Sequence, residues 1–280
     1  MHSTASDGKF DPVDVVRMAA EAGLSVLALA DHDTVAGIPA ALDAAKNYPP
    51  LRVIPAVEIN TDVPKGEAHV LGYFIDYHNE LLNTTLSSMR DSREDRAQGM
   101  IAKLKQLGLP IEWQRVKEIA GTGSVGRPHI AQPLLEKGYI TTIKEAFDKY
   151  IGWGGPAYVE RHKMSPTDAV KLILQANGLP VLAHPLTLVY PEAMIIELKA
   201  AGIVGLETYY DNNTPDSINK VRQWARKYSL IATGGSDFHG LDANAETRIG
   251  GANVPLAAAE QLIVLAEKRG ILHKRSQHAG

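Results

Sequence analysis

The chain has 280 residues, of which 45% are hydrophobic and 22% charged, the proportions of a globular protein with a sizeable core. Its formal net charge of −3 excludes a global attraction for nucleic acid or membranes, so any site for an anionic substrate must be local. It has no cysteine, which excludes disulfides, thiolate zinc sites and a cysteine nucleophile. With no signal-peptide core and no apolar run near the roughly 20 residues that span a bilayer, we expect a cytoplasmic protein.

The first part of the chain alternates short helices and strands. The segment from Asp11 to Ala22 is amphipathic and predicts a helix, with Pro12 in its first turn and Gly23 as its stop. Strands are predicted at 26–30, 52–59 and 68–75, a helix at 38–46 and a turn at 61–67. This alternation is typical of a mainly parallel α/β architecture.

Residues 78–160 interrupt this alternation with helices, predicted at 81–107, 111–120 and 130–137, and a segment at 150–158 rich in glycine and aromatic residues. Strands are then predicted again at 180–183, 204–208 and 230–233, with helices at 166–176, 191–200, 215–227 and 256–268. We therefore expect residues 1–77 and 161–280 to form one α/β domain and residues 78–160 to form a helical insertion subdomain.

Side chains able to bind metals stand beside the ends of several predicted strands. Each histidine alone is more often a core or surface residue, but burying several ionisable groups is costly unless something compensates. We therefore expect one rim where the candidate ligands converge: His2, Asp7, His32, Glu58, His69, His184, Asp237 and His239. Imidazole and carboxylate suit manganese, iron or zinc, and these ligands exceed the needs of one ion, so we expect two or three divalent ions, with manganese favoured. Such a cluster lowers the pKa of bound water to about 7 and binds both the attacking and the leaving oxygen.

The same residues occur in six ordered motifs. The motifs are His2-Ser3 through Asp7-Gly8, Asp31-His32-Asp33, Val57-Glu58, His69-Val70-Leu71-Gly72, Ala183-His184-Pro185 and Ser236-Asp237-Phe238-His239. In order and local context they resemble the polymerase-and-histidinol-phosphatase (PHP) family of phosphoesterases over nearly the whole chain. The resemblance implies a distorted (β/α)7 barrel with a metal cluster at the carboxyl ends of its strands. The helical insertion is similar to that of the branch that removes phosphate from 3′,5′-nucleoside bisphosphates or trims short RNA from its 5′ end.

The resemblance implies a metal-dependent phosphatase that uses metal-bound hydroxide on a phosphomonoester of a small nucleotide or short oligonucleotide. The implied catalytic residues are Asp7, His32, Glu58, His184 and Asp237. The alternatives are a phosphatase for another metabolite, such as histidinol phosphate, and a non-catalytic binding module. Stable binding to duplex nucleic acid or to a membrane is not expected.

Three residues of the insertion, Arg93, Arg96 and His129, match positions that contact substrate phosphate in that branch. Guanidinium groups bind phosphate through two hydrogen bonds, and residues three apart share a helix face. The alternative is a solvated helix face, because Glu94 and Asp95 lie in the same turn.

The segment Gly121–Gly126 fits G-x-G-x-x-G, but a dinucleotide-binding motif must follow a strand, and residues 116–120 read as helix. We expect instead a loop that positions Arg127 and His129 over the metal rim.

The family's first motif is His-x-His, and Met1 stands at its middle position. We expect an upstream segment ending in Asp-Leu-His to supply the first histidine and the first barrel strand. The alternative is a lost ligand, which would weaken one of the metal sites.

Overall fold

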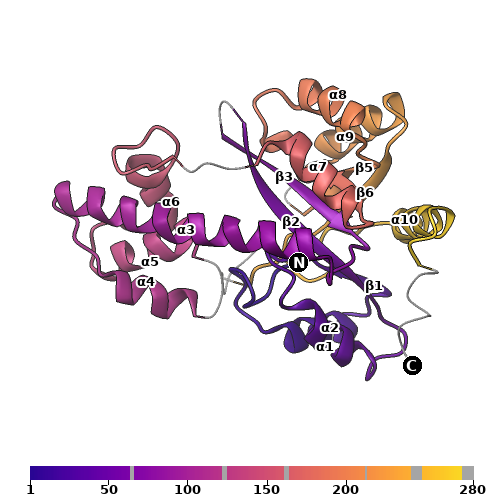
Figure 1. The fold of residues 1–280 in the computed structure, drawn as a ribbon, viewed down its shortest axis with the longest axis horizontal. Helices are drawn as coiled ribbons and strands as arrows, with labels where there is room; N and C mark the ends of the chain where they lie inside the picture. The colour runs from indigo at the N-terminus through magenta and orange to yellow at the C-terminus, as the bar shows by residue number, and fades with distance from the viewer. Residues whose placement is uncertain (64–65, 122–124, 161–163, 212, 241–247, 273–280) are drawn as a thin grey trace.

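The computed structural model describes residues 1–63, 66–121, 125–160, 164–211, 213–240 and 248–272. These residues form a mixed α/β fold around one sheet, with its strands in the order β1-β2-β3-β4-β5-β6 at the centre of Figure 1. The strands are β1 (Val26–Leu29), β2 (Arg52–Val63), β3 (Gly66–Tyr73), β4 (Leu179–Leu182), β5 (Gly205–Tyr210) and β6 (Ile231–Gly235).

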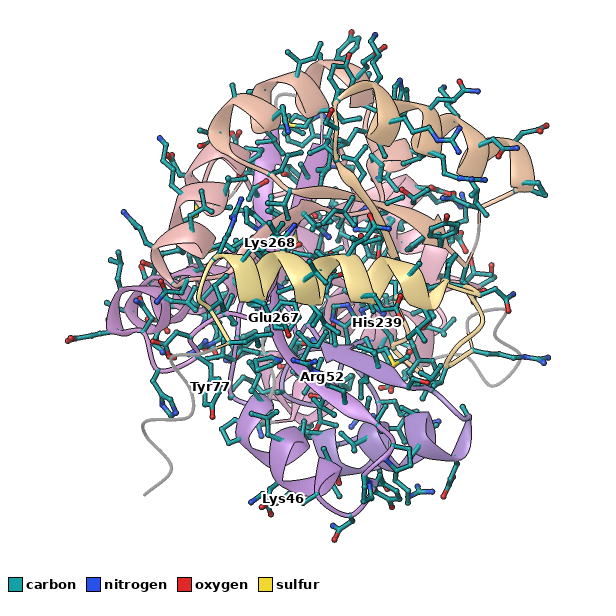
Figure 2. The ribbon with its side chains drawn as sticks, turned by 90° about the vertical axis from the view of Figure 1, so that its right-hand side faces the viewer. Lys46, Arg52, Tyr77, His239, Glu267 and Lys268 are labelled. Atoms are coloured by element: carbon teal, nitrogen blue, oxygen red, sulfur yellow. The ribbon has the colours of Figure 1, made fainter. Side chains whose placement is uncertain are left out.

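Helices cover both faces of this sheet, which is why its central strands are apolar almost throughout. Along β2, Val57 and Ile59 pack with α7 (Pro166–Gln175), α8 (Pro191–Ala201) and α9 (Pro215–Lys227). The alternate residues Ile54 and Ala56 belong to a second cluster, with Leu262 of α10 (Leu256–Lys268). Figure 2 turns α10 toward the reader, where it lies across the molecule. None of the helices in the described part of the chain is long and apolar enough to cross a bilayer.

The predicted helix at the start of the chain is confirmed as α1 (Pro12–Glu21). The Asp11 side chain caps it by accepting a hydrogen bond from the Asp14 backbone N–H, and Pro12 stands in its first turn. Together with α2 (Ile38–Ala45), this helix packs its apolar residues against β1.

The sheet is mainly parallel, as predicted, but β3 runs antiparallel to both β2 and β4. The predicted turn at 61–67 is too long, because Thr61 pairs with Ala68 and Asp62 with Glu67. Strands joined by so short a connection pair antiparallel, since a parallel pair needs a crossover of a dozen or more residues. The central residues of the predicted turn, 64–65, lie outside the described residues. Because of this hairpin, His69 near the start of β3 lies beside Asn60 of β2.

The helical segment has a core of its own and lies to one side of the sheet in Figure 1. It consists of α3 (Glu80–Gln106), α4 (Trp113–Ala120), α5 (Arg127–Glu136), α6 (Ile143–Ala146) and a π-helical turn, η1 (Phe147–Ile151). The first half of α3 packs through Leu82 and Leu86 against the sheet, and its second half packs through Met100 and Leu104 into the core of the helical segment. The long helix therefore joins the two cores.

The edge strands β1 and β6 border a cavity of about 410 Å³ that reaches Glu58 and Asp237. At its rim the Ala30 N–H donates to the Met1 carbonyl at 2.9 Å, and the His2 N–H donates to the Phe238 carbonyl at 2.9 Å. These two bonds fix the first residues of the chain between the loops that follow the two edge strands.

Candidate metal centre

The eight candidate ligands lie in one cluster at one end of the sheet, although they come from six places in the chain. Backbone pairing brings several of them side by side, since His32 forms a parallel bridge with Glu58 and the His69 carbonyl accepts from the Ala183 N–H. Three overlapping groups have ligand atoms within 4.8 Å of one another: His2, Asp7, His32 and His239; His32, Glu58 and His69; and His2, Glu58 and Asp237. The eighth residue, His184, directly follows β4 and contacts two members of the second group.

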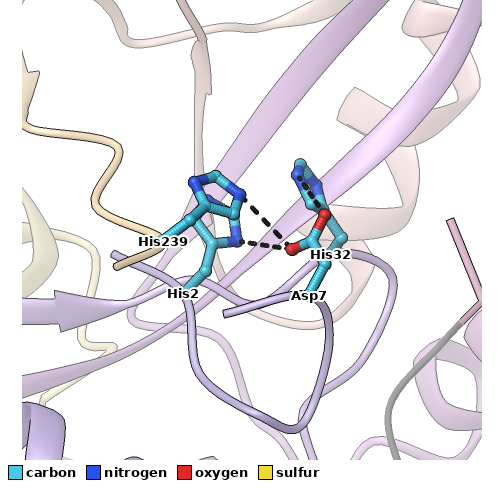
Figure 3. A group of neighbouring side chains, drawn as sticks. All are labelled: His2, Asp7, His32 and His239. Atoms are coloured by element: carbon cyan, nitrogen blue, oxygen red, sulfur yellow. Dashed lines mark ion pairs between the residues drawn. The ribbon is translucent and has the colours of Figure 1, made fainter. Parts of the chain in front are cut away.

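Asp7 is the centre of the first group, which Figure 3 shows. Its Oδ1 lies 3.3 Å from His239 Nε2 and 3.9 Å from His2 Nδ1, and its Oδ2 lies 3.9 Å from His32 Nε2. The rings of His2 and His239 stack with their centroids 4.0 Å apart. Three imidazoles thus surround one carboxylate.

Glu58 is the centre of the other two groups. Its Oε1 lies 2.8 Å from His69 Nδ1 and 3.3 Å from His184 Nε2, while its Oε2 lies 3.1 Å from His2 Nε2. His2 Nε2 also lies 2.9 Å from Asp237 Oδ1. We had expected Glu58 at the end of a strand at 52–59, but β2 continues to Val63, so Glu58 lies inside the strand with its side chain 4% exposed.

The pKa of each ionisable group in this cluster depends on burial and on the charges of its neighbours. Burial opposes ionisation of Glu58, but the surrounding histidines outweigh it and hold the pKa of this carboxyl well below its usual range. Burial likewise opposes protonation of His2, but its hydrogen bonds to Asp237 and Glu58 raise its pKa to about 10. For His32 burial prevails and lowers the pKa to about 4. At His2 the neighbouring carboxylates thus outweigh burial, whereas at His32 burial outweighs the carboxylates.

The residues of the cluster fit divalent metal ions. His2 Nδ1 and Asp7 Oδ1 are buried and have no hydrogen-bond partner among the residues that the structure describes. Such an atom costs about 1–3 kcal/mol unless something satisfies it. The donors are imidazole nitrogens and carboxylate oxygens, the set that manganese, iron and zinc accept. A metal ion at this position would satisfy both atoms.

The loop that carries His2 and Asp7 is fixed by Asp31, a role that sequence reasoning missed. The buried Asp31 carboxylate accepts from the Ser3 backbone N–H at 2.7 Å, from Ser3 Oγ at 2.7 Å and from Ser6 Oγ at 2.6 Å. All three donors lie between the two candidate ligands. The sequence signal was present, since Asp31 ends the first apolar run, but its partners could not be read from the pattern.

The buried Glu207 in β5 is a second residue that sequence reasoning missed. Its Oε2 accepts from the His184 backbone N–H at 2.8 Å, and burial raises its pKa to about 7. His184 has a positive φ of 22°, which is uncommon for a residue other than glycine. The hydrogen bond that His184 donates to Glu207 therefore holds a strained backbone in place. The signal for Glu207 in the sequence was an acidic residue inside a predicted strand.

Arg93 is fixed by a buried ion pair. Its Nε donates to Asp33 Oδ2 at 2.9 Å, and its Nη2 donates to the same oxygen. Asp33 is fully buried, accepts the Asn60 N–H at 2.9 Å through Oδ1, and accepts from Arg90 at 3.1 Å through its carbonyl. Two arginines of α3 thus bind the loop that follows β1.

The cleft beside the cluster has a volume of about 180 Å³ and two kinds of wall. One wall contains ligand candidates, and the other contains arginines from the helical segment; together they include Asp7, His32, His69, Arg93, Arg96 and Arg127. His129 does not line the cleft: it is buried, and its Nδ1 accepts from the Gly126 N–H at 2.9 Å. Of the loop expected to position Arg127 and His129, residues 122–124 lie outside the described residues, and a helix, α4, precedes it.

Comparison with known proteins identifies relatives of the whole fold, although no family model matches the chain. The chain is 35% identical over 242 residues to a 5′-3′ exoribonuclease of Haemophilus influenzae, covering 85% of this chain and 88% of that protein. It is 33% identical over 253 residues to a 3′,5′-nucleoside bisphosphate phosphatase of Chromobacterium violaceum, with 85% of each chain covered.

A solved structure of a metal-dependent phosphoesterase from Bifidobacterium adolescentis matches with a TM-score of 0.85 at 26% identity. The match covers 94% of this chain and 93% of that one. The same family is indicated by the six ordered motifs, by the cluster that they form and by these relatives. The chain is a phosphoester hydrolase that uses divalent metal ions, and it belongs to the PHP family of metal-dependent phosphoesterases.

Proposed function

We propose that this hydrolase acts on a phosphomonoester of a small nucleotide that carries a second phosphate, or on the 5′ end of a short oligonucleotide. The observation that carries this proposal is the cleft, in which ligand candidates such as His32 and His69 face Arg96 and Arg127. One phosphate can lie at the metal cluster while a second lies against the guanidiniums. The names of the exoribonuclease and bisphosphate phosphatase relatives agree with such a substrate.

In this proposal the metal cluster holds two or three divalent ions, manganese favoured, and Asp7, His32, Glu58, His184 and Asp237 form the catalytic centre. The ligands are His2, Asp7, His32, Glu58, His69, His184, Asp237 and His239. Bound ions would supply a nucleophilic water at neutral pH and neutralise charge on the phosphoryl group. Glu58, which contacts histidines from four segments, keeps these ligands in one constellation.

The arginines hold the substrate. Arg96 and Arg127 offer guanidinium donors to the second phosphate, and a planar guanidinium can bind two phosphate oxygens at once. Arg93 lines the same cleft but is already bound to Asp33, so it adds positive charge from a fixed position. His129, the third residue expected to contact substrate phosphate, lies behind the cleft wall, where burial lowers the pKa of its imidazole.

We also infer that the sheet belongs to a distorted (β/α)7 barrel built from residues 1–77 and 161–280, with residues 78–160 as an insertion subdomain. The separate core of the helical segment and the arginines that it contributes to the cleft support this division. The insertion would then determine which substrate binds, and the barrel would supply the residues that hold the metal ions for hydrolysis.

The test is a phosphate-release screen with manganese, iron or zinc added. Its substrates are adenosine 3′,5′-bisphosphate, AMP, a 5′-phosphorylated trinucleotide, histidinol phosphate and p-nitrophenyl phosphate. We expect the highest kcat/KM for the bisphosphate or the trinucleotide. A higher value for histidinol phosphate would replace the proposed substrate class. No hydrolysis of either the bisphosphate or the trinucleotide with any of the metals would likewise exclude the proposed substrate class.

A further inference from the structure

Two arginines of the cleft form an anion site apart from the metal cluster. The side chain of Arg96 is 10% exposed, and its Nε and Nη2 are buried with no hydrogen-bond partner among the described residues. Burial, and then the neighbouring Arg127, lower the pKa of the Arg96 guanidinium. The rings of Tyr158 and Phe147 lie 5.4 Å from the guanidinium carbons of Arg96 and Arg127, respectively. A guanidinium with buried, unused donors beside a second guanidinium favours an anion between them.

Glu67 lies at this site. Its Oε2 is 3.0 Å from Arg127 Nη2, and its Oε1 is 3.8 Å from Arg96 Nη1. The same Oε2 is 3.8 Å from Nε2 of His69, which lies two residues further along β3 and therefore on the same face of the strand. Glu67 thus lies between the arginine pair and a candidate metal ligand, in contact with the guanidiniums that would bind the second phosphate.

We propose that Glu67 is a specificity-determining residue that occupies the place of the substrate's second phosphate until that phosphate displaces it. This inference rests on the proposed function. The carboxylate compensates the two arginines in the free protein, and a ligand must compete with it. Binding therefore depends on the charge and the oxygens that a ligand brings to the pair.

The competition selects one class of substrate. A terminal phosphate carries a charge of about −1.5 to −2 at pH 7 and three acceptor oxygens. A phosphodiester or a carboxylate carries a single negative charge, no more than Glu67 itself. The side chain of Glu67 is 21% exposed, so it can move out of the site without unfolding its strand. Glu67 therefore favours substrates with a terminal second phosphate over those with a diester at that position.

The test uses the full chain with Glu67→Gln, which removes the charge and keeps the shape. We expect the KM for adenosine 3′,5′-bisphosphate, relative to that for p-nitrophenyl phosphate, to fall about 5- to 10-fold. This is the change expected if the Glu67 carboxylate occupies the site most of the time and so weakens the apparent binding of the second phosphate. The ratio of kcat/KM for the bisphosphate to kcat/KM for a nucleotide with a diester in place of its second phosphate should become smaller. The control is Glu94→Gln on α3, whose partner is Lys117 at the surface, and it should change neither quantity.

Binding measurements separate this inference from the proposed function. Titration calorimetry of inorganic phosphate into metal-free protein reports on the arginine pair without catalysis. Tighter binding to the Glu67→Gln variant than to the unchanged protein supports the inference even if the bisphosphate is not a substrate. Unchanged or weaker binding, or a higher KM, would show that Glu67 orients the arginines and would overturn it. If the Gln variant melts at a much lower temperature, Glu67→Ala is measured in the same way and judged by the same criteria.

Discussion

The metal cluster and the arginine wall of the cleft are built in different ways. The cluster takes its side chains from strands, from the loops that follow them and from the segment before α1. Backbone hydrogen bonds such as those from the Asp33 N–H to the Glu58 carbonyl and from the Glu58 N–H to the Asp31 carbonyl help to fix its geometry. The arginines come from α3 and from the start of α5, where Asp33 binds Arg93 and Glu67 binds Arg127. In the proposed function, the chemistry therefore depends on sheet topology, while substrate choice depends on a few ion pairs between two cores.

The largest predicted effect comes from a substitution in the metal cluster, at Glu58. Replacing it with Gln removes the carboxylate that contacts His2, His69 and His184 but keeps its volume. Phosphate release from every ester should fall about 10³-fold, equivalent to ~4 kcal/mol of transition-state stabilisation. Bound metal, measured by elemental analysis, should fall with it. A Glu192→Gln variant at the surface is the control, and equal activity of the two variants would remove Glu58 from the catalytic centre.

The second prediction concerns the ion pair that joins the two regions. Arg93→Ala removes the guanidinium from the buried carboxylate of Asp33, so it should lower the free energy of unfolding by about 3–5 kcal/mol in urea titrations. Asp33→Asn added to it should restore much of the loss, because no buried charge then remains. Activity should fall on both p-nitrophenyl phosphate and a bisphosphate. A loss confined to the bisphosphate would instead make Arg93 a phosphate-binding residue only.

Unlike Arg93, Arg96 should affect one class of substrate far more than the other. It lies on the same helix but has unused donors in the cleft, so Arg96→Ala should weaken hydrolysis of a nucleoside bisphosphate by about 10- to 100-fold. Hydrolysis of p-nitrophenyl phosphate should change far less, because that ester has no second phosphate. Steady-state kinetics on both substrates provide the measurement, with Arg115→Ala on the distant surface of α4 as the control. Equal losses on both substrates would assign Arg96 to structure.

The sequence was informative where a signal is local. An apolar run that ends in Asp31-His32-Asp33, or in Ala183-His184, predicts a side chain at a strand end from adjacent residues alone. The long helix α3 was placed to within one residue at each end because its pattern is also local. The antiparallel direction of β3 was missed, because it follows from a hairpin whose strands were read as a turn.

Contacts between distant segments could not be predicted. Arg93 follows Asp33 by 60 residues, and nothing in the spacing of the α3 arginines shows that one is bound to a buried carboxylate while another keeps free donors. The same limit applies to Glu207, which lies 23 residues after the backbone N–H that it holds. Sequence patterns identify which side chains can take part in the site, whereas the pairing of elements decides which of them bind the others.

The smallest predicted effect tests whether a buried carboxylate that binds a distant segment matters for the metal cluster. Asp31→Asn keeps the size of the side chain but replaces one acceptor oxygen with an NH2 group, which must face N–H and O–H donors from Ser3 and Ser6. The loop between His2 and Asp7 should shift, and manganese affinity should fall by roughly 10- to 100-fold, the usual cost of losing a residue that orients a ligand. Titration calorimetry with Mn²⁺ measures this, and Asp43→Asn, the same change at an exposed position, is the control. If saturating Mn²⁺ restores full phosphate release to Asp31→Asn, its role is to position the loop. If activity stays low at saturation, Asp31 takes part in the reaction more directly and does more than support the loop that carries His2 and Asp7.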